Sequence, residues 1–371
     1  MRRTIHSELK KEHRNYINSL LEPTENETST KRITKKFWGY VRSKRKDTTN
    51  IPLLKRPDGT EATDSEEKCN ILNKQYESVF TTEDPNVPVP ESNDIPTIDA
   101  INVTTAGVTK QLLNLDTTKA TGPDSIPPRI LKDCAQEVAP YLQILFQQSI
   151  DEGEVPDDWK HAKITAIYKK GRRDEPSNYR PVSLTSVPCK LLEHIIFHSV
   201  MEHLDSHQIL VDSQHGFRKA RSCETQLLNT IETIASSLEN KEQTDLLILY
   251  FSKAFDTVPH QRLLVKLQHN GVRDQEPNDS NKHQKLLTWV KNWLCDRTQE
   301  VVLDGKSSQK CKVLSGVPQG TVLGPLCFLI FINDLGNHIS PGTMVKLFAD
   351  DSLLFRTVKS SDDCDILQKD L

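Results

Sequence analysis

The feature that most constrains this chain is a pair of adjacent carboxylates, Asp350 and Asp351, that lies between two short apolar runs. Because successive side chains of a strand point to opposite faces, the pattern favours strands at 345–348 and 352–355, joined by a tight turn that carries both acids. Two like charges this close repel each other unless protons or cations relieve them, and Mg²⁺ prefers oxygen ligands. These residues alone also fit an acidic surface turn, so the rest of the chain has to decide.

Length and charge set broad limits on what the chain does. Its 371 residues are enough for two or three domains, and a formal net charge of −3 gives no overall basic field that would indicate nucleic acid. The basic side chains are nevertheless uneven, with one cluster at 31–46 and a second at 169–173. Each cluster predicts either a nucleic-acid contact or an ordinary solvated face.

The eight cysteines are scattered without CxxC spacing, which favours neither a zinc site nor a secreted disulfide framework. Reduced thiols in an intracellular protein fit this pattern best. No apolar run reaches the length of a membrane span, and the start of the chain lacks the apolar core of a signal peptide. We therefore expect no membrane partner.

The first part of the chain, residues 1–100, is interpreted as a helical, basic connector region that ends in a linker. Polar helices are expected at 7–21 and 33–46. The stretch 83–99 is rich in proline, asparagine and aspartate, which predicts a domain boundary there. The main domain is expected to cover 101–371.

Two short signals stand out inside the connector region. The sequence Pro57-Asp58-Gly59 is strong turn chemistry and predicts a short hairpin. Asp64 and Glu67 then have the spacing of a capping box, which predicts the start of a helix.

Beyond the boundary, predicted helices alternate with a few strands. Helices are expected at 104–115, 128–150, 190–204, 223–238, 262–269, 286–294, 320–335 and 361–371, and strands at 164–168 and 178–184. The run 246–251 is continuously apolar, which is typical of a strand buried on both faces. Asp304-Gly305 between two apolar stretches predicts a hairpin.

Seven stretches then resemble, in the same order, the reverse transcriptases of non-LTR retrotransposons of the jockey-like or CR1-like kind. The stretches are KATGPD at 119–124, AIYKKG at 166–171, NYRPVSL at 178–184, QHGFR at 214–218, FSKAFDTVPH at 251–260, SGVPQGTVLGPL at 315–326 and the acidic hairpin itself. One such motif alone would be weak evidence for a family. Seven motifs in order over about 106–358 make a chance match negligible, and the surface-turn interpretation of the acid pair falls with it.

The resemblance implies an α+β fold: the fingers and palm of a right-hand polymerase, with an antiparallel palm sheet backed by packed helices. It also implies template-directed nucleotidyl transfer onto a DNA 3′ end, with an RNA template, a DNA primer and dNTP substrates. The family's location would be nuclear, with the cytoplasm as the alternative. Because the chain stops soon after the acidic hairpin, the thumb is expected to be missing and apolar palm surface to be uncovered.

The resemblance further implies roles for individual residues. Asp350 and Asp351 would hold two Mg²⁺ ions, with Mn²⁺ as an alternative, beside the backbone carbonyl of Phe251. The implied nucleotide-binding residues are Lys169, Arg180, Phe255, Gln319 and Gly320, of which Phe255 would be the steric gate that excludes a 2′ hydroxyl. An ordinary solvated lysine at 169 and a packed core aromatic at 255 are the competing interpretations.

The decisive departure from the family pattern is Tyr250, which stands where the resemblance implies a third metal-binding aspartate. A phenol is neutral at pH 7, is a poor Mg²⁺ ligand, and fills space that the ions would occupy. Our hypothesis is that this copy keeps the polymerase fold but is impaired in catalysis. The competing interpretation is that Tyr250 is simply a packed strand aromatic.

Other classes of function remain open at this stage. The stretch 274–284 is interpreted either as an insertion relative to the family pattern or as a mis-predicted exon. A non-catalytic nucleic-acid-binding remnant of a retroelement is the main alternative, and a reading frame whose product does not fold stably is a third. A viral RNA polymerase fits the acidic hairpin and the stretch around Gln319 less well.

Overall fold

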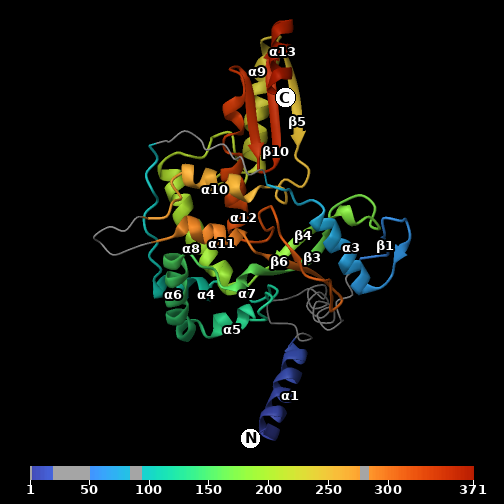
Figure 1. The fold of residues 1–371 in the computed structure, drawn as a ribbon, viewed down its shortest axis with the longest axis vertical. Helices are drawn as coiled ribbons and strands as arrows, with labels where there is room; N and C mark the ends of the chain where they lie inside the picture. Colours follow the sequence, from blue (N-terminus) through green and yellow to red (C-terminus); the bar gives the residue numbers. More distant parts are fainter. Residues whose placement is uncertain (1, 20–50, 84–93, 276–283) are drawn as a thin grey trace.

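The computed structural model describes residues 2–19, 51–83, 94–275 and 284–371. It is a mixed α/β structure in which a helical body lies beside one sheet, while a second sheet projects from the top of the view in Figure 1. The helix α1 (Arg2–Ser19) lies apart at the bottom. None of the helices in the described ranges combines the length and hydropathy that a membrane crossing needs.

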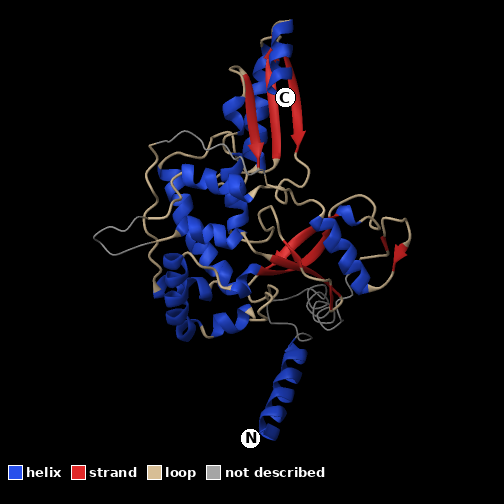
Figure 2. Cartoon of the chain, in the orientation of Figure 1, coloured by secondary structure: helices blue, strands red, loops and turns tan. Residues whose placement is uncertain are grey.

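The first sheet is a mixed sheet with the order β4-β3-β6-β7, and β8 pairs with β6. Its strands are β3 (His161–Tyr168), β4 (Tyr179–Leu184), β6 (Thr298–Leu303), β7 (Lys306–Ser307) and β8 (Cys311–Lys312). β3 and β6 run parallel, and the other pairs are antiparallel. The β3–β4 hairpin therefore pairs, through β3, with a strand that comes much later in the chain. Figure 2 shows this sheet beside the helical body.

A small hairpin and one helix, both within residues 51–83, pack against this sheet. The hairpin is β1 (Leu54–Lys55) with β2 (Glu61–Ala62), and it leads into α3 (Ser65–Glu77), which contacts β6 and β7. Leu54 and Leu72 join Val301 in a buried apolar cluster. Residues 51–83 therefore share a core with this sheet.

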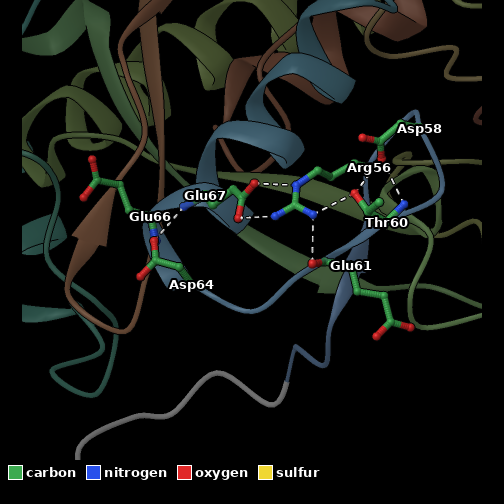
Figure 3. Close-up of polar contacts among 7 residues, drawn as sticks. All are labelled: Arg56, Asp58, Thr60, Glu61, Asp64, Glu66 and Glu67. Atoms are coloured by element: carbon green, nitrogen blue, oxygen red, sulfur yellow. Dashed lines mark hydrogen bonds and ion pairs between the residues drawn. The ribbon is translucent and has the colours of Figure 1, made fainter.

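Figure 3 shows how polar contacts hold this corner together. The side chain of Asp64 caps α3 by accepting hydrogen bonds from the backbone N–H groups of Glu66 and Glu67, at 2.9 and 3.0 Å. The predicted capping box is only half right, because the Glu67 carboxylate instead receives Arg56, whose Nη2 lies 2.8 Å away. This bidentate pair ties the helix to the hairpin, and the hydrogen bond from Arg56 lowers the pKa of the Glu67 carboxyl.

The helical body is built on a second and larger apolar core. Its helices are α4 (Thr105–Leu113), α5 (Pro128–Asp133), α6 (Ala135–Glu152), α7 (Asp157–Lys160), α8 (Val187–Ser206), α10 (His260–His269), α11 (Leu286–Leu294) and α12 (Leu323–Ile332). Trp289 and Trp293 of α11 are fully buried in this core with Phe146 of α6. Short 3-10 turns, η1 (Pro176–Asn178) and η2 (Leu335–His338), complete the description.

A buried carboxylate organises the start of α12. Glu193 of α8 has no exposed surface, and its Oε2 accepts hydrogen bonds from the backbone N–H groups of Val322 and Leu323 at 2.7 and 3.3 Å. Its Oε1 accepts the indole N–H of Trp293 at 3.2 Å. A negative group at a helix start satisfies donors that have no partner inside the helix and favours the helix dipole.

The second sheet has three antiparallel strands in the order β5-β10-β9. They are β5 (Gln243–Tyr250), β9 (Thr343–Phe348) and β10 (Asp351–Val358), with α9 (Cys223–Glu239) against β5 and β9, and α13 (Ser361–Asp370) against β10. The predicted acidic hairpin is confirmed, and its strands are longer than expected. Asp351 belongs to β10 instead of to the turn.

The prediction that 246–251 is buried on both faces is wrong. β5 lies at the edge of its sheet in the described structure, and its side chains alternate, leaving Ile248 77% and Tyr250 60% exposed. The buried strand is the central one, β10, where Leu354 and Phe355 are each 1% exposed. Exposed apolar side chains also lie on α9 and β5: Leu227, Leu228, Ile231, Leu238, Leu246 and Ile248.

Most other predicted elements are confirmed with shifts of a few residues at their ends. The expected helix at 33–46, the basic cluster at 31–46, most of the proline-rich stretch and most of the insertion lie outside the described residues. The Asp304-Gly305 hairpin is present, with positive φ angles of 50° and 77° at its two turn residues. All eight cysteines are free thiols, as their spacing predicted.

Replacing Glu193 tests the buried cap. Glu193→Ala should lower the free energy of unfolding by about 3 kcal/mol, because two backbone donors and one indole lose their acceptor inside the core. Urea denaturation followed by circular dichroism measures this, with Glu232→Ala on the exposed face of α9 as the control. Equal midpoints for the two variants would contradict the assigned role.

Candidate active site

The acidic turn is held in place by backbone contacts from the segment 213–216. Ala349 has a φ of 56°, in the left-handed region, and its N–H donates to Oε1 of the buried Gln214 at 3.0 Å. The N–H of Gly216 donates to the same oxygen at 2.7 Å. Backbone hydrogen bonds join Leu347 to Ser213 and to His215, each at 2.9 Å. Gln214, His215 and Gly216 belong to the QHGFR motif, which contributed to the family resemblance. The sequence alone did not predict that this motif supports the acidic turn.

The strand register brings Tyr250 beside the acid pair. In the sheet, Asp351 lies directly opposite Tyr250 on one side and Phe348 on the other. Asp350 is half-buried in the turn, whereas Asp351 is exposed. Asp245 lies at the far end of β5, opposite Arg356, and so cannot serve as a substitute third acid.

The Tyr250 hydroxyl is engaged by a lysine from the other sheet. Lys169 follows the end of β3, and its Nζ donates to the Tyr250 hydroxyl at 2.8 Å. The same Nζ lies 5.3 Å from the centre of the tyrosine ring. This hydrogen bond lowers the pKa of the Tyr250 phenol from its usual value. The contact joins the end of β3 in the first sheet to the end of β5 in the second.

A cleft of about 630 Å³ lies between the two sheets and the start of α12. It brings together most of the residues that the sequence singled out: Lys169, Arg180, Tyr250, Phe255, Gln319, Gly320 and Asp350. Lys169, Lys170 and Arg180 are exposed, so that basic groups face the acidic turn across the opening. Asp351 and Phe251 lie outside this lining.

The aromatic and glycine positions in the cleft have specific packing. Phe255 is half-buried and stacks on Phe328 of α12 with ring centres 4.3 Å apart, so one face is packed while the residue still lines the cleft. Gly320 has a φ of 97°, and a Cβ there would lie 3.0 Å from the carbonyl oxygen of Ser183 in β4. Both the packing role and the cleft role predicted for Phe255 are therefore compatible with its position.

The donor set at the turn suits fewer metal ions than the resemblance implies. Among the described residues, no group of three or more histidine, cysteine, aspartate and glutamate side chains is arranged to hold a metal. Asp350 and Asp351 could share a single divalent ion. Tyr250, where the resemblance implies a third carboxylate, instead presents a phenol that is hydrogen-bonded to the Lys169 ammonium group. These residues do not fit a pair of divalent ions, which needs more carboxylates.

Comparison with known proteins decides the family. The model of the family "Reverse transcriptase (RNA-dependent DNA polymerase)" matches residues 167–370, which is more than half of the chain. The chain belongs to the reverse transcriptase family. Members of this family generally use divalent metal ions, a nucleic-acid template and primer, and nucleotide substrates.

Several relatives come from mobile elements of insects. The chain is 29% identical over 348 residues to the RNA-directed DNA polymerase from mobile element jockey of Drosophila melanogaster, which covers 89% of this chain and 36% of the relative. It is 28% identical over 318 residues to the probable RNA-directed DNA polymerase from transposon BS of the same fly, covering 81% of this chain and 33% of the relative. This reverse transcriptase chain thus spans about a third of the length of these relatives.

Gly216 offers a test of how the turn is held. A Cβ at this position would lie 2.3 Å from the backbone nitrogen of Ala349, so Gly216→Ala must displace either the turn or the segment that supports it. We expect a loss of about 2 kcal/mol in the free energy of unfolding, measured by urea denaturation. Gly336→Ala is the control, because a Cβ there meets no atom within 4 Å. Equal losses in the two variants would refute the close packing.

Proposed function

We propose that this chain is the polymerase part of a non-LTR retrotransposon reverse transcriptase, built for nucleotidyl transfer onto a DNA 3′ end from an RNA template. The observation that carries the proposal is the cleft in which the acidic turn faces Lys169 and Arg180. We assign the β3–β4–β6 sheet to the fingers and the β5–β10–β9 sheet to the palm. No thumb is assigned within the described residues.

In this proposal the cleft binds the nucleotide through a small set of side chains. Arg180 and Lys169 bind the triphosphate, because a guanidinium and an ammonium suit phosphate oxygens. Phe255 contacts the sugar, and the backbone at Gln319 and Gly320 approaches the nucleotide closely. Asp350 and Asp351 lie where the primer end would meet the α-phosphate. A divalent ion held by these carboxylates would stabilise negative charge on the reacting oxygens.

We further propose that Tyr250 impairs this copy in two ways. It replaces a carboxylate, which could cost several kcal/mol of transition-state stabilisation and therefore on the order of 10³-fold in rate. Its hydroxyl also engages Lys169, the lysine assigned to the triphosphate. Nucleotide binding and metal binding would then be weakened by the same side chain.

Restoring the carboxylate is the direct test of the proposed function. Tyr250→Asp should raise the rate of primer extension on an RNA template by about 10³-fold, because the third oxygen ligand returns. Tyr250→Phe is the matched control: it releases Lys169 without adding a carboxylate and should improve only nucleotide binding. Equal extension rates in the unsubstituted chain and Tyr250→Asp would overturn the impairment, and no extension by any of them would count against the polymerase assignment.

A non-catalytic nucleic-acid-binding remnant is the second candidate function. It is favoured by the exposed basic groups Lys169, Lys170 and Arg173 beside the cleft. In this case the chain would bind a primer–template duplex with a steep salt dependence, yet Tyr250→Asp would not gain extension.

The basic end of β3 gives a separate prediction about binding. Lys170→Ala should weaken binding of a primer–template duplex and lower the slope of log Kd against log salt concentration by roughly one, because one phosphate contact is lost. Fluorescence anisotropy at several salt concentrations measures this. Lys110→Ala on α4 serves as the control, and an equal change in both variants would show that Lys170 has no specific contact.

The division of the chain and its location are also proposals. We propose a connector region at 1–100 and a polymerase domain at 101–371, although residues 51–83 share a core with the sheet. A nuclear location follows from the resemblance to retrotransposon proteins.

A further inference from the structure

A small cavity of about 30 Å³ adjoins the proposed nucleotide cleft, and one polar pair lines both spaces. Asp256 and Gln319 line both the cleft and the small cavity, together with Pro181 and Pro318. Asp256 has no assigned role in the proposed chemistry, and it follows the end of β5 by several residues. The pair therefore forms part of the wall behind the nucleotide.

The geometry of this pair fixes the orientation of an amide. Nε2 of Gln319 donates to Oδ1 of Asp256 at 2.9 Å. An ionised carboxylate can only accept hydrogen bonds, so it selects the NH₂ end of the amide and leaves the carbonyl end for another partner. We propose that Asp256 is a positioning residue that holds Gln319 so that its Oε1 is offered to the cleft as a hydrogen-bond acceptor. This inference rests on the proposed function, because the donor it would receive is a hydroxyl or amino group of a bound nucleotide.

Hydrogen bonds hold the backbone on both sides of Asp256, which makes this residue suited to the role. Its N–H donates to the carbonyl of Lys253 at 2.8 Å, and its own carbonyl accepts the hydroxyl of Ser315 at 2.8 Å. The N–H of Val317 donates to the carbonyl of Phe255 at 2.8 Å. At Gly316, where φ is 88°, a Cβ would lie 2.7 Å from the carbonyl oxygen of Asp256. The two loops can approach this closely only with glycine at 316.

The backbone of Gln319 is also held by a hydrogen bond. The carbonyl of Gln319 accepts the N–H of Ser183 in β4 at 2.8 Å, so the glutamine backbone is tied to the first sheet. Its side chain then reaches across to Asp256, which joins that sheet to the loop after β5. The amide thus spans the two halves of the cleft, and its orientation depends on the carboxylate that it meets.

The surroundings of Asp256 affect the pKa of its carboxyl, and only the ionised form selects the NH₂ end of the Gln319 amide. Burial raises the pKa of the Asp256 carboxyl, while the hydrogen bond from Gln319 and the charge of Lys253 act in the opposite direction. Tyr76 of α3 and Arg297, just before β6, line the small cavity with it. Once protonated, the carboxyl becomes a donor and can hold the carbonyl end of the amide instead, so the fixed orientation is lost as the pH falls.

The first arm of the test observes the contact without any activity. The full chain is labelled with ¹⁵N-glutamine, and the side-chain amide signal of Gln319 is assigned by its loss in Gln319→Ala. We expect this signal to shift as Asp256 is protonated, starting at a higher pH than for an ordinary aspartate, and this shift to vanish in Asp256→Asn. A signal that does not respond to pH or to Asp256→Asn would overturn the proposal.

The second arm asks whether the contact serves nucleotide binding. Primer extension is measured in the Tyr250→Asp background, where turnover is expected. Asp256→Asn should raise the KM for dNTP about tenfold, since the amide can then turn either end to its partner. In the presence of Gln319→Ala, Asp256→Asn should change KM less than twofold. Asp116→Asn, in an exposed turn, is the matched control and should leave KM unchanged.

The outcomes separate the two claims. Additive effects of Asp256→Asn and Gln319→Ala on KM would show that Asp256 does not act through Gln319, and the positioning role would be wrong. A lower kcat and a lower free energy of unfolding in Asp256→Asn, with no change in the KM for dNTP, would likewise assign Asp256 a merely structural role. If the amide signal behaves as expected but no variant extends a primer, the proposed function fails, and the nucleotide role of the pair falls with it.

Discussion

The pairing of β5 with β10 is the constraint on which the site depends. It fixes Asp351 opposite Tyr250, and no shift of a single residue could keep this pairing while preserving which side chains are buried in the centre of the sheet. The turn before β10 is then held from behind by Gln214 and Gly216, where a backbone approach leaves no room for a side chain. The acid pair is therefore a supported feature of the sheet and not an incidental surface turn.

The same register also gives Tyr250 a contact with the first sheet. Because Tyr250 ends the edge strand, its hydroxyl reaches Lys169 at the end of β3 and joins the two walls of the cleft. The amide of Gln319 joins the same two walls deeper inside, through Asp256. Two polar contacts from different elements thus join the walls of the cleft, one between exposed side chains and one between partly buried side chains.

Much of this architecture could be predicted from the sequence, because turn chemistry and apolar periodicity are local. The acidic hairpin, the Asp304-Gly305 turn and the order of the helices follow from such signals. The burial of β5 could not be predicted, since a continuous apolar run does not reveal whether a strand is central or at an edge; here the run lies at the edge and β10 takes the centre. The capping box failed for a similar reason, because Arg56 from a neighbouring hairpin competes for Glu67. The contacts of Gln214 and Asp256 join segments that are distant in the sequence, so no local sequence pattern predicts them.

The central claim is that a phenol stands where a third metal-binding oxygen is needed. The most direct measurement is a titration of the full chain with Mn²⁺, followed by electron paramagnetic resonance, in the unsubstituted chain and in Tyr250→Asp. We expect at most one ion in the first and a spin-coupled pair in the second. A coupled pair of ions in the unsubstituted chain would contradict the account.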